Sequence, residues 1–241
     1  MQVLFVFSRL LDYPDQGLYQ DRALFDELID ESPLQTLSKK RLNSFFDKYL
    51  TMDLMSWQAQ YDGLFERGRS LGLWLFEHVH GESRDRGQAM VELLANYRAA
   101  GLEINQQELP DYIPLFLEFL VTQGEDNARE WLIQVEHILA LIMCRLEQRE
   151  SDYAALFELL LELADSDLDL DALRQQLAGE KRDDTAEALD KEWEEEVVTF
   201  GADTGGGGCS SQTEGGETVR EVPVTWMDFD QTRRHSPPDR G

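Results

Sequence analysis

Hydrophobic residues recur along most of this chain with the period of an α-helix. One apolar stripe consists of Leu64, Gly68, Leu71, Leu75 and Val79. A second consists of Trp131, Val135, Ile138, Leu139, Ile142 and Leu146, and a third of Leu156, Leu159, Leu160 and Leu163. Residues three and four apart share one face of a helix, whereas strands alternate every second residue. The pattern predicts helices near 2–11, 18–30, 34–50, 53–79, 86–100, 110–123, 126–148, 152–164 and 170–178.

Helix-breaking residues separate these stretches. They are found at Tyr13-Pro14, Ser32-Pro33, Gly81, Gly101 and Gly124. Proline and glycine commonly end helices, and short connections between amphipathic helices are typical of helical bundles. We therefore expect residues 1–178 to form a single compact multi-helix bundle of the all-α class, followed by a flexible acidic C-terminal tail.

The composition changes after residue 178. Residues 179–200 form an acidic segment, in which Asp184 and Glu187 have the spacing of a capping box. A short amphipathic helix is expected to follow, with an apolar stripe of Leu189, Trp193, Val197 and Phe200. Residues 201–241 are predicted to be a glycine-rich linker and a disordered tail. The apolar motif around Trp226 either becomes ordered on a partner or folds back onto the bundle.

Charge and cysteine content narrow the classes of partner. The 241 residues carry a formal net charge of −26, which disfavours binding to nucleic acid or to anionic membrane surfaces. Only two cysteines are present, and their surroundings do not indicate a disulfide, as expected for a cytoplasmic protein. We find no signal peptide pattern and no apolar stretch long enough to insert into a membrane.

The histidines do not form a metal site in the expected helix. His78 and His80 are two residues apart, so they would point away from each other, and no further histidine or cysteine is near in sequence. Both should lie at a helix C-terminus, where the helix dipole favours a charged imidazolium. The alternating aspartates Asp165 to Asp171 lack the glycine and glutamate of a calcium loop, so one of them is expected to cap the next helix.

Two short motifs and the polar run between them are the most distinctive features. The motifs are Tyr61-Asp-Gly-Leu-Phe65 and Glu108-Leu-Pro-Asp-Tyr112, and the run extends over residues 77–87. Asp111 and Glu118 are seven residues apart, so one helical face would offer both carboxylates to a basic peptide. Gly68, Gly72 and Gly87 fall within the helical pattern, where each glycine makes the helix about 1 kcal/mol less stable than alanine would. This cost indicates close helix packing or close approach of a ligand to the backbone.

These residues resemble the signature pair of the redox-enzyme maturation chaperones. The run from Leu75 to Met90 is more specific and is similar to the nitrate reductase delta-subunit branch of that family. The resemblance extends over residues 1–200, and the segment around Trp226 is also similar. In the wider family the second motif often ends in histidine, whereas this chain has Tyr112.

The resemblance implies an all-helical chaperone without catalytic activity or a cofactor of its own. Its partner would be the apo catalytic (alpha) subunit of a membrane-bound respiratory nitrate reductase, including the N-terminal segment of that subunit. The chaperone would keep the subunit ready for insertion of the molybdenum cofactor and delay its docking to the membrane. It would not be part of the final enzyme.

The implied binding site is a groove for a client helix. We expect its walls and acidic rim to consist of Tyr61, Leu64, Phe65, Glu108, Asp111, Tyr112, Leu115, Phe116 and Glu118. A structural role is expected for Arg67, His78, His80, Arg84, Asp85, Arg86 and Pro110, with the arginines pairing with carboxylates inside the protein. Two alternatives remain open, a permanent structural subunit and a metal-dependent hydrolase that would use Glu77, His78, His80 and Asp111.

Overall fold

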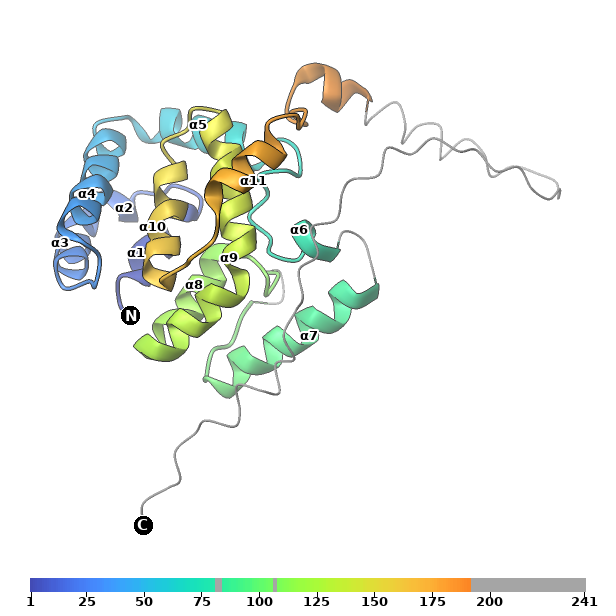
Figure 1. The fold of residues 1–241 in the computed structure, drawn as a ribbon. Coiled ribbons are helices and arrows are strands. Elements are labelled where there is room, and N and C mark those ends of the chain that lie inside the picture. The colour runs from blue at the N-terminus through green and yellow to red at the C-terminus, as the bar shows by residue number, and fades with distance from the viewer. Residues whose placement is uncertain (81–83, 106–107, 192–241) are drawn as a thin grey trace, which may run out of the picture.

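The protein is a bundle of helices in a computed structural model that describes residues 1–80, 84–105 and 108–191 (Figure 1). The helices are α1 (Leu4–Leu11), α2 (Gly17–Gln20), α3 (Arg22–Asp30), α4 (Thr36–Leu50), α5 (Leu54–Phe65), α6 (Glu77–His80), α7 (Arg84–Ala99), α8 (Ile113–Val121), α9 (Glu125–Gln148), α10 (Ala154–Ala164) and α11 (Leu170–Leu177). The described residues contain no strand, and the expected all-α fold is confirmed.

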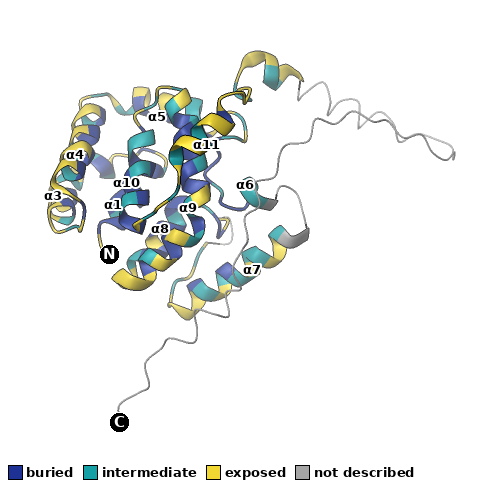
Figure 2. Cartoon of the chain, in the orientation of Figure 1, coloured by how far each residue is buried: buried dark blue, intermediate teal, exposed yellow. Residues whose placement is uncertain are grey.

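The longest helix, α9, runs through the bundle and packs against α10 and α11, while α1 packs against α8. The apolar faces of these helices are buried, whereas α3 and α4 expose much of their outer surface (Figure 2). Helix α9 begins after Gly124, which has φ 81°, and carries Glu125 and Asp126 in its first turn, where the helix dipole favours acidic residues. Asp169 caps α11 by accepting a hydrogen bond from Ala172 N, as the run of aspartates predicted.

The largest difference from the predicted helices concerns residues 53–79. Helix α5 ends at Phe65, and residues 66–76 form turns and an extended segment. Gly68 adopts φ 82°, a left-handed conformation that a continuing helix does not allow. Leu71, Leu73, Leu75 and Phe76 are all buried, so this segment contributes side chains to the core without being helical.

Two smaller differences affect helix starts. Helix α8 begins at Ile113, so Pro110 precedes the helix and Pro114 is tolerated in the first turn. Residues 186–191 are helical, but the cap is Thr185, whose Oγ1 accepts a hydrogen bond from Ala188 N, and not Asp184. The expected continuation of that helix and the tail around Trp226 lie outside the described residues. The domain boundary at 178 stays a prediction.

In the described part of the chain, no helix has both the length and the apolar character needed to cross a membrane.

Candidate functional site

The two sequence motifs meet at the end of α1. Tyr61, on α5, donates a hydrogen bond of 2.8 Å to the carbonyl oxygen of Leu11, and its hydroxyl lies 3.3 Å from that of Tyr112. The Tyr112 hydroxyl donates to Asp12 Oδ1 at 3.0 Å. Three segments that are far apart in sequence are therefore held together through two tyrosine hydroxyls.

The extended segment after α5 joins the second motif through the backbone. Leu75 N donates to Asp111 O at 2.9 Å, and Ile113 N donates to Leu73 O at 2.8 Å. These bonds form an isolated antiparallel bridge between Trp74 and Tyr112, whose rings lie 5.9 Å apart. The segment after α5 and the second motif are consequently one structural unit.

Asp111 is buried in this unit, with none of its surface exposed. Its Oδ2 accepts a hydrogen bond from Phe76 N at 3.2 Å and lies 3.8 Å from the Arg86 guanidinium. Burial raises the pKa of the Asp111 carboxyl above its usual value. The expectation that Asp111 and Glu118 share an exposed helical face is wrong, because Asp111 precedes α8 and points into the protein.

Arg86 lies beside two carboxylates, and the structural role expected for it stays a prediction. Its guanidinium lies 3.5 Å from Glu77 and 3.8 Å from Asp111, so it links α7 to both sides of the bridge. Arg67 is exposed, and its pairing with a carboxylate stays a prediction. The side chains of His80, Arg84 and Asp85 lie outside the described residues. Pro110 is buried, and its carbonyl accepts a hydrogen bond of 2.7 Å from Tyr97.

His78 differs from the expected imidazolium at a helix end. Its Nε2 lies 2.7 Å from the carbonyl oxygen of Gly72, which can only accept, so Nε2 carries the proton and donates. Burial lowers the pKa of His78 to about 4 because it disfavours the charged form more strongly than this carbonyl favours it. His78 therefore fixes the turn at Gly72 as a neutral side chain.

The predicted groove walls divide into two groups. Tyr61, Phe65 and Phe116 are at most 2% exposed, so they belong to the core and are closed to a client in this conformation. Leu64, Tyr112 and Leu115 are half-buried, and Glu108 and Glu118 are exposed.

The exposed carboxylates gather around the half-buried aromatic rings. Burial raises the pKa of Tyr112, and the negative charges of Asp12 and Glu66 raise it further. Burial also raises the pKa of Glu118, and Asp12 and Glu108 act on it in the same direction. We call Asp12, Glu66, Glu108 and Glu118 the acidic rim. Arg9 lies 3.8 Å from Asp12 and also acts on Glu118, so it offsets part of this charge. The described surface where the two motifs meet therefore has more carboxylates than cations and is partly aromatic.

A second cluster, which was not predicted from the sequence, forms where residues 180–184 of the acidic segment fold back onto the bundle. The Asp183 carboxylate accepts hydrogen bonds of 2.7 Å from Arg69 N and from Ser70 N, and one of 2.5 Å from Ser70 Oγ. Arg149, only 4% exposed at its side chain, lies 3.3 Å from Asp183 and 3.4 Å from Asp184. The segment thus ties the loop after α5 to α9. The available signal in the sequence was the pair of cations Arg145 and Arg149, at the C-terminal end of the apolar stretch of α9.

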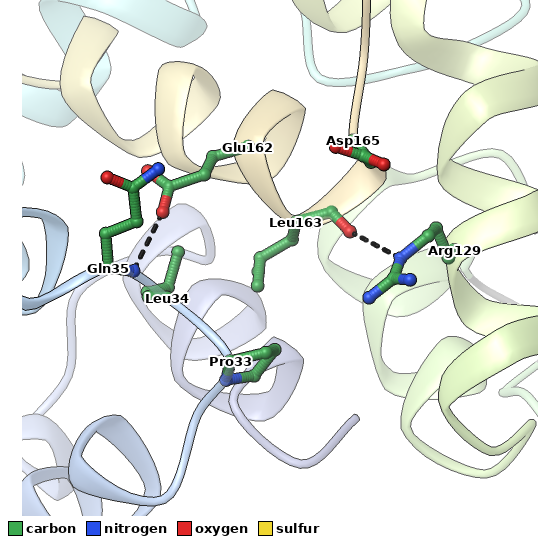
Figure 3. A pocket seen from close by; sticks show the side chains of 7 residues that line it. All are labelled: Pro33, Leu34, Gln35, Arg129, Glu162, Leu163 and Asp165. Atoms are coloured by element: carbon green, nitrogen blue, oxygen red, sulfur yellow. Dashed lines mark hydrogen bonds between the residues drawn. The ribbon is translucent and has the colours of Figure 1, made fainter.

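A pocket of about 260 Å³ lies away from both motifs (Figure 3). It is lined by Pro33, Leu34, Gln35, Arg129, Glu162, Leu163 and Asp165. Two hydrogen bonds join its lining residues: Glu162 accepts from Gln35 N at 2.9 Å, and Leu163 O accepts from Arg129 Nε at 3.4 Å. No predicted site residue lines this pocket.

No group of three or more histidine, cysteine, aspartate or glutamate residues in the described ranges could hold a metal ion. The four residues of the hydrolase alternative include His78, which bonds to a carbonyl, and Asp111, which faces Arg86.

Comparisons with known proteins identify relatives over most of the chain. The family model described as nitrate reductase delta subunit matches residues 31–158. The chain is 50% identical over 205 residues to the Escherichia coli (strain K12) protein named "Nitrate reductase molybdenum cofactor assembly chaperone NarJ", covering 85% of this chain and 87% of that protein. It is 46% identical over 200 residues to "Probable nitrate reductase molybdenum cofactor assembly chaperone NarW" of the same strain, covering 83% and 84%.

A solved chain from Archaeoglobus fulgidus, a candidate redox enzyme maturation protein, covers 69% of this chain and 94% of its own length, with 20% identity and a TM-score of 0.48. That likeness is too loose to transfer the role of any residue.

The family match covers more than half of the 241 residues. The NarJ protein of Escherichia coli is 50% identical to this chain over 85% of its length. The resemblance of the two motifs and the polar run is thereby confirmed. The chain belongs to the nitrate reductase delta subunit family.

Proposed function

We propose that this protein is a system-specific chaperone for a membrane-bound respiratory nitrate reductase. It binds the apo catalytic (alpha) subunit in the cytoplasm, keeps it ready for insertion of the molybdenum cofactor and delays its docking to the membrane. The observation that supports this function most directly is the 50% identity with a relative named as such an assembly chaperone, across 85% of the chain. The chaperone itself performs no catalysis.

We propose further that the client segment is the N-terminal part of the catalytic subunit and that it first contacts the acidic rim. In the rim, Asp12 and Glu66 act on Tyr112, and Asp12 and Glu108 act on Glu118. Tyr13, which directly follows Asp12, is 45% exposed. An amphipathic segment with basic residues matches a surface of this kind, because its cations face the carboxylates while its apolar side chains cover the rings.

Calorimetric titration with a peptide of that N-terminal segment tests the site. The double variant Glu108→Gln/Glu118→Gln removes two rim charges without changing side-chain size. We expect its affinity to fall by about fivefold at low salt, because exposed charges of this kind contribute less than about 1 kcal/mol each. The difference should shrink as salt screens the charges.

The matched control is Glu103→Gln/Glu130→Gln, which removes two exposed carboxylates that are not members of the rim. Equal affinity of the two double variants would move the client site away from the acidic rim.

The chaperone role itself is tested by capture of the apo catalytic subunit with the full chain, followed by reconstitution with cofactor. We expect the chain to leave the mature enzyme. Its presence in the finished membrane complex at equal stoichiometry would identify it as a permanent subunit.

A further inference from the structure

Helix α7 lies at the outer edge of the bundle and presents one face to it (Figures 1 and 2). That face carries Arg86, Met90, Leu93 and Tyr97, at spacings of four, three and four residues. Leu93 and Tyr97 are buried, Met90 is partly buried against the core, and Val91 on the other side is 62% exposed. The helix is therefore amphipathic, with a cation at the start of its apolar stripe.

The surface beneath α7 holds this stripe at three points. Arg86 faces Glu77 and Asp111 at the first point. At the second point, Leu93 lines a crevice together with Leu75, Phe76, Phe116, Trp131 and Val135. The third is the Tyr97 hydroxyl, which donates to Pro110 O, with the ring 4.7 Å from that of Phe119. We call these contacts the α7 seat.

The α7 seat includes residues of the second family motif and of the polar run. Asp111 and Pro110 belong to the second motif, and Glu77 belongs to the polar run. The crevice is only about 10 Å³ in volume, so no further helix fits while α7 is in place. Any segment that uses these residues must displace α7.

The polar end of the seat is incompletely bonded. Asp111 Oδ1 and Arg86 Nε are buried without a hydrogen-bond partner, and the two groups are 3.8 Å apart at their nearest charged atoms. Buried polar atoms without partners cost free energy, so another occupant with a better placed cation could satisfy Asp111 more fully.

We propose that α7 is an internal occupant of a client-binding seat, and that an amphipathic helix of the client replaces it. This inference rests on the proposed function and specifies the mode of binding. The client helix would carry a cation followed by apolar residues four, seven and eleven positions later, as α7 does. Its cation would take the place of Arg86 at Asp111, and the acidic rim beside Pro110 would guide its approach.

The variant Tyr97→Phe tests the competition. It removes the hydrogen bond to Pro110 and keeps the ring against Phe119. Loosening α7 raises the fraction of molecules with an open seat, so we expect the client peptide to bind about threefold to tenfold more tightly. Val91→Ala, on the exposed face of the same helix, should leave the affinity at the wild-type value.

Hydrogen exchange on the full chain provides a second measurement that does not depend on a variant. We expect saturation with client peptide to increase exchange of the amides in 86–99, because α7 leaves its seat. Slower exchange there, or unchanged or weaker binding by Tyr97→Phe while the wild type binds, would overturn the replacement of α7. Failure of the wild type to bind either the peptide or the apo subunit would instead overturn the proposed function.

Discussion

The indole Nε1 of Trp57 donates a hydrogen bond of 2.8 Å to the hydroxyl of Tyr153, and neither side chain has any exposed surface. This bond joins α5, which carries the first motif, to the segment that precedes α10. The Tyr153 ring also packs edge-on against Phe45 and Phe65.

Replacing Tyr153 by phenylalanine should therefore destabilise the protein although the aromatic packing is kept. The indole N–H of Trp57 would be buried without an acceptor, which costs about 1–3 kcal/mol of the free energy of unfolding. Urea denaturation followed by tryptophan fluorescence measures the loss. Tyr13→Phe is the control, because Tyr13 is 45% exposed, and a similar loss in both variants would contradict the argument.

Two glycines should respond in opposite directions when replaced by alanine. Gly68 has φ 82°, and a Cβ there would lie 2.8 Å from the Asp183 carboxyl carbon, so we expect Gly68→Ala to destabilise the protein by about 1–3 kcal/mol. Gly63 lies inside α5 with no atom within 4 Å of an added Cβ. Gly63→Ala should stabilise the helix by about 0.5–1 kcal/mol. Thermal unfolding of both variants measures these changes in stability. If both variants were stabilised, or both destabilised, the placement of the loop after α5 would be refuted.

The stability of the protein should fall between about pH 6.5 and pH 4 because of His78. The folded state lowers the pKa of His78 from 6.5 to about 4. In this range the unfolded chain binds a proton that the folded protein does not, so stability is lost as the pH decreases. The contribution of this one group is at most roughly 3 kcal/mol.

His78→Gln keeps a donor for Gly72 O but does not titrate. We expect the free energy of unfolding of this variant to change less with pH in the same interval, as measured by urea denaturation at several pH values. The control is His137→Gln, which removes an exposed histidine of α9 by the same substitution. An unchanged slope in His78→Gln would show that other groups cause the acid sensitivity.

The buried Arg149, which follows α9, and the more exposed Arg174 of α11 should differ in their contributions to the free energy of unfolding. Arg149→Met leaves Asp183 and Asp184 without their shared cation, so we expect a loss of about 2–4 kcal/mol and faster proteolysis in residues 179–184. Arg174 pairs with Glu147 at 41% exposure of its side chain. Arg174→Met should cost less than about 1 kcal/mol, because solvent screens exposed pairs. Similar losses in the two variants would contradict a tightly docked acidic segment.

The helix positions were predictable because each helix buries one face in the bundle, so apolar residues recur in the sequence with the helical period of about 3.6 residues. Helices α9 and α10 begin and end within two residues of their predicted bounds. Residues 66–76 were misassigned because their apolar positions fit both periods. Leu71, Leu73 and Leu75 also alternate, and Gly68 and Gly72 were the signal against a helix.

The environment of Asp111 and the docking of Asp183 were beyond prediction for a different reason. Both depend on partners that are distant in sequence: Asp111 faces Arg86, and Asp183 binds the backbone at Arg69 and Ser70. Local pattern assigns a charged residue to the solvent unless its partner is known. For Arg86 the sequence did indicate an internal carboxylate, and the structure identifies it as Asp111 together with Glu77.

The fit between Gly68 and Asp183 also has an evolutionary consequence. The carboxylate fills the space where any larger residue 68 would place its Cβ, so position 68 cannot change freely while Asp183 is kept. Lineages that have lost the aspartate should accept asparagine at position 68, because asparagine tolerates the left-handed conformation and would no longer meet a carboxylate. An alignment of many relatives should therefore show positions 68 and 183 changing together, although 115 residues separate them.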